Sequence, residues 1–265
     1  MWGDMEETYI IGGYDIRDIQ NVMLDILMAI DKACEENGIG YVLMGGTLLG
    51  AIRHQGFIPW DDDADIMMTR DDYDRFMKVA EECLPEDYVF QCMENTEKYP
   101  YNFGKVFASE TLYTESGTAH LPICHGVYVD VFPMDYVSEK DYLHQAKMVS
   151  HYTDVRYYKL GMIHEWRYAP FALAPLSFLN HMADRHMRYY KKDKDKLCQL
   201  CHFGPHKPVT DRSFLTDTIR VPFWGKMLPV PREYDRYLTM RYGDYMTPPP
   251  KEKQRPTHNI KGIKL

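Results

Sequence analysis

The sequence predicts an α+β fold in which a mixed or antiparallel sheet is flanked by helices and joined to a helix-rich additional region. Two amphipathic helical patterns, over 15–36 and 69–84, lie on either side of a short apolar run that ends at a glycine pair. Several short strand-like runs follow between 88 and 132, and helical patterns return over 139–194. The close succession of short strands indicates an antiparallel or mixed sheet, because parallel neighbours need long crossover connections.

The composition is that of an ordinary globular protein. The 265 residues are 45% hydrophobic and 26% charged, which allows one large domain, or a domain with an appended lobe, around a substantial core. The net charge of -8 argues against a nucleic-acid partner, because binding a phosphate backbone requires clustered Lys and Arg. A nucleotide that is held through a metal ion does not require such a basic surface.

Cysteine usage and the N-terminus bear on the compartment. Scattered cysteines, together with a start that has no basic or apolar leader pattern, predict reduced thiols in a cytoplasmic protein. Cys198, Cys201, His202 and His206 could bind zinc, although their cramped spacing favours reduced structural cysteines. The longest apolar stretch, 169–179, contains two prolines and is far shorter than the roughly 20 residues of a membrane span.

The first predicted helix begins at its cap, Asp15, and runs to about Glu36, with Gly38 beyond its end. Its apolar residues recur at helical spacing. One face of this helix should therefore cover the central sheet, and its acids should lie on the solvated face.

A glycine pair follows the apolar run 41–44. Gly45, Gly46 and Thr47 open a short helical pattern, and a helix that starts after a strand offers backbone N–H groups and a positive dipole end to an anion. Arg53, near the end of this pattern, could neutralise the charge of a leaving nucleotide, since guanidinium and phosphate match bidentately. A surface arginine is the alternative.

An acidic run, DDDAD, leads into the next predicted strand, 64–68. Asp61, Asp63 and Asp65 are spaced by two, so an extended chain would project all three from one face. Carboxylates on one face repel one another unless a cation lies between them. Hard divalent cations take oxygen ligands, and Mg²⁺ is usually held by one or two carboxylates together with substrate phosphates. Beside the glycine pair, this run predicts a site for metal-assisted phosphoryl or nucleotidyl transfer.

Thr69 and Asp72 are typical of a variant capping box for a helix over 70–84. The next strands are predicted over 88–92, 102–107, 111–114 and 126–132. Asp130 lies among apolar residues of the last strand, where an isolated carboxylate is costly unless it is paired or bound to a metal. We therefore expect Asp130 to join the acidic site, and Asp135 to cap the following loop.

The segment 139–194 is helix-rich and basic toward its end. Trp166, Phe171 and Phe178 could face a lipid-linked acceptor or a membrane surface, although ordinary helical packing is the favoured interpretation. The remaining segments are predicted to be a loop, a short helix and a proline stop, over 222–231, 232–242 and 248–250.

Three segments together resemble a known family: GGTLLGAIRHQGFIPWDDDAD (45–65), HGVYVDVFPMD (125–135) and YGDYMTPPPKEKQRPTH (242–258). The first is the densest match. It resembles the signature of the LicD family, phosphocholine transferases that are similar to fukutin and fukutin-related protein, within the nucleotidyltransferase-fold superfamily. The resemblance implies a nucleotidyltransferase-like catalytic core (1–137), a helix-rich lobe (138–218) and a C-terminal block that packs back on the core (219–265).

The resemblance also implies an activity: transfer of a phosphocholine-like group, or another phospho-alcohol, from a CDP-linked donor such as CDP-choline to a sugar hydroxyl, with release of CMP. The acceptor would be a glycan or lipid-linked glycan, such as lipopolysaccharide or teichoic acid, met in the cytoplasm or at the inner face of the membrane. Asp63, Asp65 and Asp130 would hold one or two Mg²⁺ or Mn²⁺ ions, and Asp61 would be the general base or an outer-sphere ligand. Phosphate or acceptor contacts would come from Gly45, Gly46, Thr47, Arg53, Lys105, Thr111, Arg255 and His258.

Two other functions stay open. A nucleotidyltransferase of the same fold would transfer NMP from an NTP to a small molecule or sugar, and the carboxylates alone do not distinguish the two reactions. A non-catalytic binding protein is the other, and the intact set of acids disfavours it. Choline would call for an aromatic cage through cation–π contact, for which Tyr99, Tyr101, Tyr113 and Trp166 are among many candidates.

Overall fold

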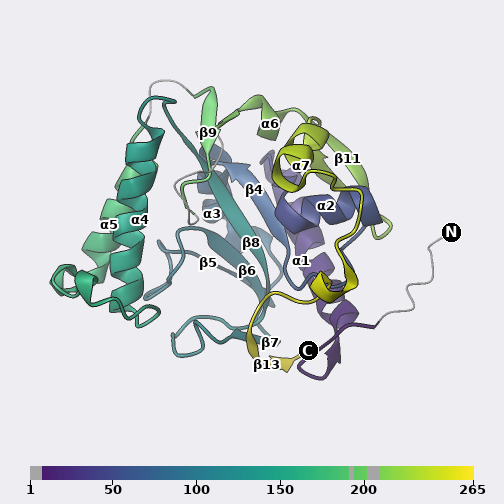
Figure 1. The fold of residues 1–265 in the computed structure, drawn as a ribbon, viewed down its shortest axis with the longest axis horizontal. Coiled ribbons are helices and arrows are strands. Elements are labelled where there is room, and N and C mark those ends of the chain that lie inside the picture. The colour runs from purple at the N-terminus through teal and green to yellow at the C-terminus, as the bar shows by residue number, and fades with distance from the viewer. Residues whose placement is uncertain (1–7, 191–193, 202–208) are drawn as a thin grey trace.

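The computed structural model describes residues 8–190, 194–201 and 209–265. In these residues a sheet of seven strands lies at the centre, with helices packed against it and a helical hairpin at one side (Figure 1). Its strands are β3 (Val42–Leu43), β4 (Asp65–Thr69), β5 (Tyr88–Gln91), β6 (Gly104–Ala108), β8 (Val127–Tyr136), β9 (Lys196–Cys198) and β10 (Thr210–Asp211). The order is β10-β9-β8-β4-β3, and β6 also pairs with β8 and carries β5. Because β4 and β8 are parallel while β6 and β8 are antiparallel, the predicted mixed sheet and the α+β class are confirmed.

Helix α1 (Ile16–Asn37) packs against β8 and is capped as predicted. The Asp15 carboxylate accepts a hydrogen bond from the Arg17 N–H, and Gly38 ends the helix in the left-handed conformation. On the buried face the Gln20 amide donates to the carbonyls of Ile58 and Asp61, at 3.0 and 2.8 Å. The helix thus holds the turn from which the acidic run begins. Ahead of it lies a small hairpin, β1 (Ile10–Ile11) and β2 (Tyr14–Asp15).

Helix α3 (Arg70–Cys83) begins where β4 ends. The predicted cap is confirmed, since the Thr69 hydroxyl accepts from the Asp72 N–H and donates to its carboxylate. The expectation for Asp135 was wrong. Strand β8 continues beyond 132 because β4 and then β9 pair with it, and the buried Asp135 carboxylate accepts a hydrogen bond from Arg70 Nε at 2.7 Å.

The helix-rich segment forms a hairpin of α4 (Tyr142–Lys159) and α5 (Leu176–Met187), with η1 (Trp166–Tyr168) and η2 (Phe171–Leu173) between them (Figure 1). Val155, Tyr168 and Leu179 make a small buried cluster of their own inside it. None of the described helices is both long enough and apolar enough to cross a bilayer.

The C-terminal part differs from prediction at one element. Instead of a loop over 222–231, β11 (Thr218–Phe223) and β12 (Lys226–Pro231) form an antiparallel hairpin. The prolines had indicated a loop, but this sheet has only two strands, so a proline can leave its missing N–H on an unpaired edge. The helix predicted next is α7 (Tyr234–Tyr242), and before the hairpin lies α6 (Ser213–Thr216).

The chain then returns to the core. After η3 (Lys251–Lys253), strand β13 (Ile260–Lys264) pairs with β7 (Leu112–Glu115), so the last residues run beside the segment between β6 and β8. Figure 1 shows this end of the chain passing in front of α1. This return brings the C-terminal residues back to the core, where they can contribute side chains to a site on the sheet.

Candidate active site

The acidic run projects its side chains as the spacing predicted. Asp61, Asp63 and Asp65 are half-buried, whereas Asp62 and Ala64 between them are fully buried. The strand proper starts only at Asp65, but the Ala64 carbonyl already accepts from the Asp130 N–H at 2.8 Å. The extended conformation therefore reaches back along the run.

Sheet register brings the distant acid to the same place. Asp130 lies opposite Asp65 on the parallel strand β4 and opposite Lys105 on the antiparallel strand β6. Lys105 Nζ is 2.8 Å from Asp130 Oδ1 and 3.4 Å from the carboxylate of Glu115 on β7. Two acids 65 residues apart in the chain thus meet on neighbouring strands, and Lys105 pairs with one of them, Asp130.

The carboxylates are crowded and poorly hydrated, and both conditions raise their pKa values. Burial first, and then the charges of neighbouring acids, raise the pKa of Asp61 and of Asp65 well above their usual range, and burial also raises that of Asp63. Burial raises the pKa of Asp130 to about 6, against the opposing effect of Lys105. Among the described side chains, Asp61 Oδ2 is buried without a hydrogen-bond partner. A divalent cation would satisfy this set of groups.

The glycine pair makes room for the acids at the start of α2 (Gly45–His54), which no side chain caps. A Cβ added at Gly45 would lie 2.6 Å from Asp65 Oδ2, and one at Gly46 would lie 2.5 Å from Asp61 Oδ2. Gly45 also has a φ of 59°, which favours glycine. The buried Thr47 hydroxyl accepts from the Asp65 N–H at 2.8 Å, so it positions the first residue of β4.

Lys105 fills an aromatic cage. Its Nζ lies 3.4 Å from the centre of the Tyr128 ring, 4.9 Å from that of Tyr101 and 5.7 Å from that of Phe103. Burial acts to lower the pKa of this lysine, but the charges of Asp130 and Glu115 outweigh burial and raise it. The ammonium is therefore charged and fixed beside the acids.

The four aromatic candidates for a choline cage have different surroundings in the structure. Of its candidates, Tyr101 belongs to the cage around Lys105, while Tyr99 and Tyr113 are buried in the core. Trp166 is 84% exposed in the α4–α5 hairpin. Glu115 is a site residue that the sequence did not single out, because its role depends on Lys105 and on the Tyr101 hydroxyl, which donates to it at 3.1 Å.

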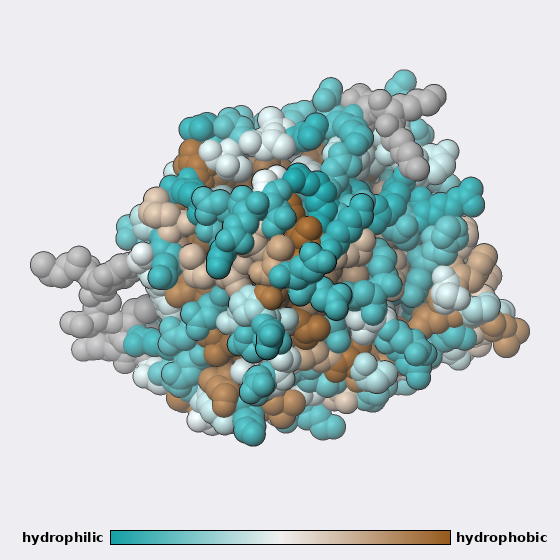
Figure 2. Space-filling model, turned by 180° about the vertical axis from the view of Figure 1, so that it is seen from behind, coloured by the Kyte–Doolittle hydropathy of each residue, from teal (hydrophilic) through white to brown (hydrophobic). Residues whose placement is uncertain are grey.

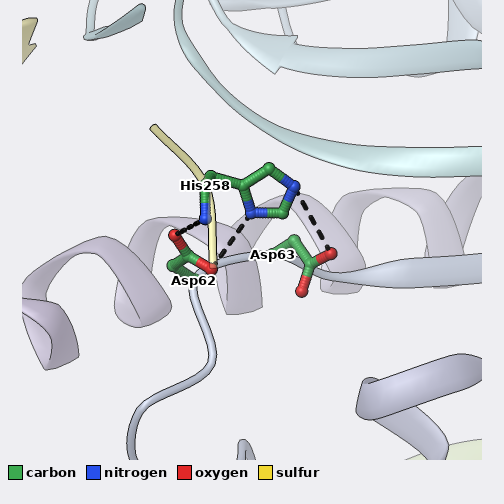
Figure 3. A group of neighbouring side chains, drawn as sticks. All are labelled: Asp62, Asp63 and His258. Atoms are coloured by element: carbon green, nitrogen blue, oxygen red, sulfur yellow. Dashed lines mark hydrogen bonds and ion pairs between the residues drawn. The ribbon is translucent and has the colours of Figure 1, made fainter. Parts of the chain in front are cut away.

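The C-terminal block is attached to the site through Asp62, as Figure 3 shows. This buried carboxylate accepts from the backbone N–H groups of Thr257 and His258, at 3.2 and 3.0 Å, and lies 3.0 Å from His258 Nδ1. His258 Nε2 is 4.0 Å from the Asp63 carboxylate. The sequence signal for Asp62 was its position, one residue out of phase with the half-buried acids Asp61 and Asp63, which turns its side chain inward.

The electrostatics of this contact favour a protonated imidazole. Burial lowers the pKa of His258, but the hydrogen bond with Asp62 and the charges of Asp63 and Asp62 raise it to about 9. Hydrogen bonds from the C-terminal block keep the pKa of Asp62 below its usual value, against the effect of burial.

Among the described residues one grouping has ligand atoms close enough to hold a metal ion, and it shares Asp63 with the predicted ligand set. Ligand atoms of Asp62, Asp63 and His258 all lie within 4.8 Å of one another. In that grouping Asp62 already accepts hydrogen bonds from the backbone N–H groups of Thr257 and His258. The grouping of Asp63 with Asp65 and Asp130 includes mutually repelling acids beside the unpartnered oxygen of Asp61. It remains our prediction for the metal ligands.

The other residues predicted to contact phosphate or acceptor differ in whether they lie near the acids. Arg53 is close to Asp61, whose charge acts on it, and it donates to the Tyr245 carbonyl at 2.9 Å. The Thr111 hydroxyl donates to the Ala108 carbonyl and accepts from the Val127 N–H, both at 2.8 Å. These bonds give Thr111 a structural role at the start of β8. Arg255 is exposed, and among the described contacts none joins its side chain to the acids.

The zinc hypothesis is only partly covered by the structure. Cys198 and Cys201 are buried, and Cys201 Sγ lies 3.5 Å from the Pro133 carbonyl. His202 and His206 lie outside the described residues.

A cavity of about 370 Å³ lies next to the acids. It is lined by Met44, directly before the glycine pair, by Met67, two residues beyond Asp65 on the same side of β4, and by residues of α6 and α7. The acids thus lie at the edge of a space that can accept a ligand of small-molecule size.

Several known proteins are similar to this chain, one of them over most of its length. A family model described as LicD/FKTN/FKRP, nucleotidyltransferase domain, matches residues 38–181. The lipopolysaccharide cholinephosphotransferase LicD of Haemophilus influenzae is 32% identical over 263 residues, which cover 92% of this chain and 96% of that protein. An uncharacterised protein of Rickettsia typhi is 50% identical over 44 residues, 17% of this chain and 14% of its own length. Another, of Rickettsia prowazekii, is 42% identical over 66 residues, 25% and 23% of the two chains.

Proposed function

Because the chain belongs to the LicD/FKTN/FKRP nucleotidyltransferase-domain family and is a transferase, we propose that it transfers phosphocholine, or a similar phospho-alcohol, from a CDP-linked donor to a sugar hydroxyl. The named relative acts on lipopolysaccharide, so the proposed acceptor is a glycan carried by a lipid. The observation that supports the chemistry is the meeting of Asp65 and Asp130 on adjacent strands, beside the glycine start of α2.

In this proposal the acceptor oxygen attacks the phosphorus distal to the cytidine. The bond from that phosphorus to the bridging oxygen breaks, and CMP leaves with the electron pair. Asp61 takes the proton of the acceptor hydroxyl, since its Oδ2 is buried without a hydrogen-bond partner among the described groups. Arg53 and the first turn of α2 neutralise phosphate charge.

Asp63, Asp65 and Asp130 would hold Mg²⁺ or Mn²⁺ in this reaction. When bound, the cation would neutralise the diphosphate and favour departure of CMP. Lys105 restrains Asp130 through their ion pair, which keeps the carboxylate oriented before the cation binds. The proposed place of reaction is the cytoplasm, at the inner face of the membrane.

The test is product analysis with matched variants. The protein is incubated with Mg²⁺, a glycan acceptor and CDP-choline, CDP-ribitol or CDP-glycerol, and we expect CMP release with at least one donor. Asp63→Asn should lower the rate by roughly 10²-fold or more, as for loss of a group that stabilises transition-state charge. Asp25→Asn, on the exposed face of α1, should leave the rate unchanged.

Two outcomes would overturn the proposal. Absence of CMP with every donor and acceptor would contradict phospho-alcohol transfer. Release of pyrophosphate from an NTP, with the nucleotide retained on the acceptor, would instead assign the nucleotidyltransferase reaction.

A further inference from the structure

The cavity beside the acids lies on the same face of the sheet as they do. Met67 follows Asp65 by two residues on β4, and Met134 follows Asp130 by four on β8, so all four side chains leave the same face. Met44, directly before the α2 glycines, also lines the cavity. A ligand in the cavity would therefore have one end at the carboxylates and at the start of α2.

Helix α7 connects this cavity with the acids. Tyr237 and Arg241 are one helical turn apart, and both line the cavity. Burial above all raises the pKa of Tyr237 to about 12, and the charge of Asp65 contributes. The charge of Asp65 also acts on Arg241. These two side chains thus line the cavity within electrostatic range of Asp65.

We propose that this cavity binds the nucleoside of the donor, with Tyr237 against the base and Arg241 at the phosphate next to the ribose. The inference rests on the function proposed above and adds the orientation of the donor. In this orientation the phosphorus distal to the nucleoside lies over Asp63, Asp65 and Asp130. The alcohol then extends toward Lys105 and Glu115.

The chemistry of the lining favours a nucleoside over the other parts of the substrates. Thioethers of Met44, Met67 and Met134, with the rings of Phe214 and Tyr237, suit the faces of a planar base. Arg241 suits phosphate, whereas Arg236 lies 3.7 Å from the carboxylate of Glu233, which also lines the cavity. The volume of about 370 Å³ is in the range of small-molecule sites.

The experiment measures binding of CMP and of phosphocholine separately, by calorimetry on the full chain with Mg²⁺ present. Tyr237→Ala and Arg241→Met should each raise the Kd of CMP by about tenfold, the loss expected for one base stack or one charged hydrogen bond. Neither variant should change the Kd of phosphocholine. Thr239→Ala, an exposed position on the same helix, is the matched control and should bind CMP as the natural chain does.

The outcomes separate this inference from the proposed function. Unchanged CMP affinity in both variants would overturn the inference, and so would weaker binding of phosphocholine in place of CMP. If CMP is bound as expected but no CDP-alcohol is turned over, the nucleoside site stands and the proposed reaction fails. Circular dichroism of both variants distinguishes loss of the site from loss of the fold.

Discussion

Gly46 keeps the Asp61 carboxylate against the first turn of α2. A Cβ at this position would lie 2.5 Å from Asp61 Oδ2, and the backbone there has no positive φ that would disfavour alanine. Gly46→Ala should therefore displace the carboxylate with little effect on the fold. We expect the turnover rate to fall by roughly 10²-fold, the cost of misplacing a reacting group by about 1 Å.

The matched control for this variant is Gly117→Ala, where no atom lies within 4 Å of the added Cβ. Steady-state rates and thermal melts of both variants are the measurement. Normal turnover by Gly46→Ala, or equal losses in the two, would show that the close approach of Asp61 does not matter.

The contact between Asp62 and His258 should make attachment of the C-terminal block depend on pH. The pKa of His258 in the folded chain is raised to about 9, above its ordinary value of 6.5. A group whose pKa is raised by folding contributes stability that is complete below the unfolded pKa and is lost as pH rises through the folded one. The stabilisation by His258 should thus be present at pH 6.5 and decline through pH 9.

Thermal unfolding in EDTA at pH 6.5, 8 and 10 tests this prediction. The melting temperature of His258→Gln should lie below that of the natural chain at pH 6.5, and the difference should shrink toward pH 10. His144→Gln, at an exposed position on α4, should follow the natural chain throughout. A difference that stays constant over this range would contradict the assigned role of the imidazole.

At the scale of elements, the end of the α4–α5 hairpin carries large apolar side chains on the surface. Trp166 is 84% exposed and Leu173 89%, and Phe171 and Phe178 are 52% and 50% exposed. Figure 2 shows hydrophobic residues gathered at this side of the molecule. Segment 159–189 has four Lys or Arg and two Asp or Glu, a formal charge of +2 in a chain of net charge -8. An apolar, locally basic patch suits an anionic lipid surface.

We therefore expect the hairpin to bind vesicles that contain anionic phospholipid. The double variant Trp166→Ser/Leu173→Ser should lose roughly 90% or more of binding in a co-sedimentation assay, because burial of both side chains contributes about 3 kcal/mol or more. Met227→Ser, which removes an exposed apolar side chain from the β11–β12 hairpin, is the control. Equal vesicle binding by all three proteins would contradict this expectation. It would also be contradicted if the natural chain self-associates and the double variant is monomeric, because the patch would then bind a second copy of the chain.

For the whole molecule, the crowded carboxylates should link metal binding to stability. Burial and the charges of Asp63, Asp130 and Asp61 raise the pKa of Asp65, which means that its ionised form destabilises the fold in the absence of a cation. Mg²⁺ at 100 times its Kd should stabilise the protein by about 2.7 kcal/mol. Asp65→Asn should raise the melting temperature without metal and remove the response to Mg²⁺.

Differential scanning fluorimetry across a Mg²⁺ titration measures both effects, with Asp25→Asn as the control that should respond like the natural chain. A variant that melts lower without metal, or that keeps the full Mg²⁺ response, would show that Asp65 is no ligand. The expected variant melts at a higher temperature without metal and no longer responds to Mg²⁺. Damage to the fold would instead lower the melting temperature without metal.

The sequence by itself determined what depends on neighbours a few residues apart. The caps at Asp15 and Thr69, the glycine start of α2 and the common face of Asp61, Asp63 and Asp65 all follow from local periodicity, and each is found in the structure. Local hydrogen bonds and the alternation of side chains in an extended chain carry this information. The acidic site could therefore be recognised before its surroundings were known.

Only the tertiary structure decided which distant groups surround those acids. Lys105 faces Asp130 through sheet register, His258 reaches Asp62 across 196 residues, and α7 closes the cavity beside Asp65. Register and long-range packing depend on the whole core, so no local pattern encodes them. For the same reason the sequence did not predict the pairing of Asp135 with Arg70, which lie 65 residues apart in the chain.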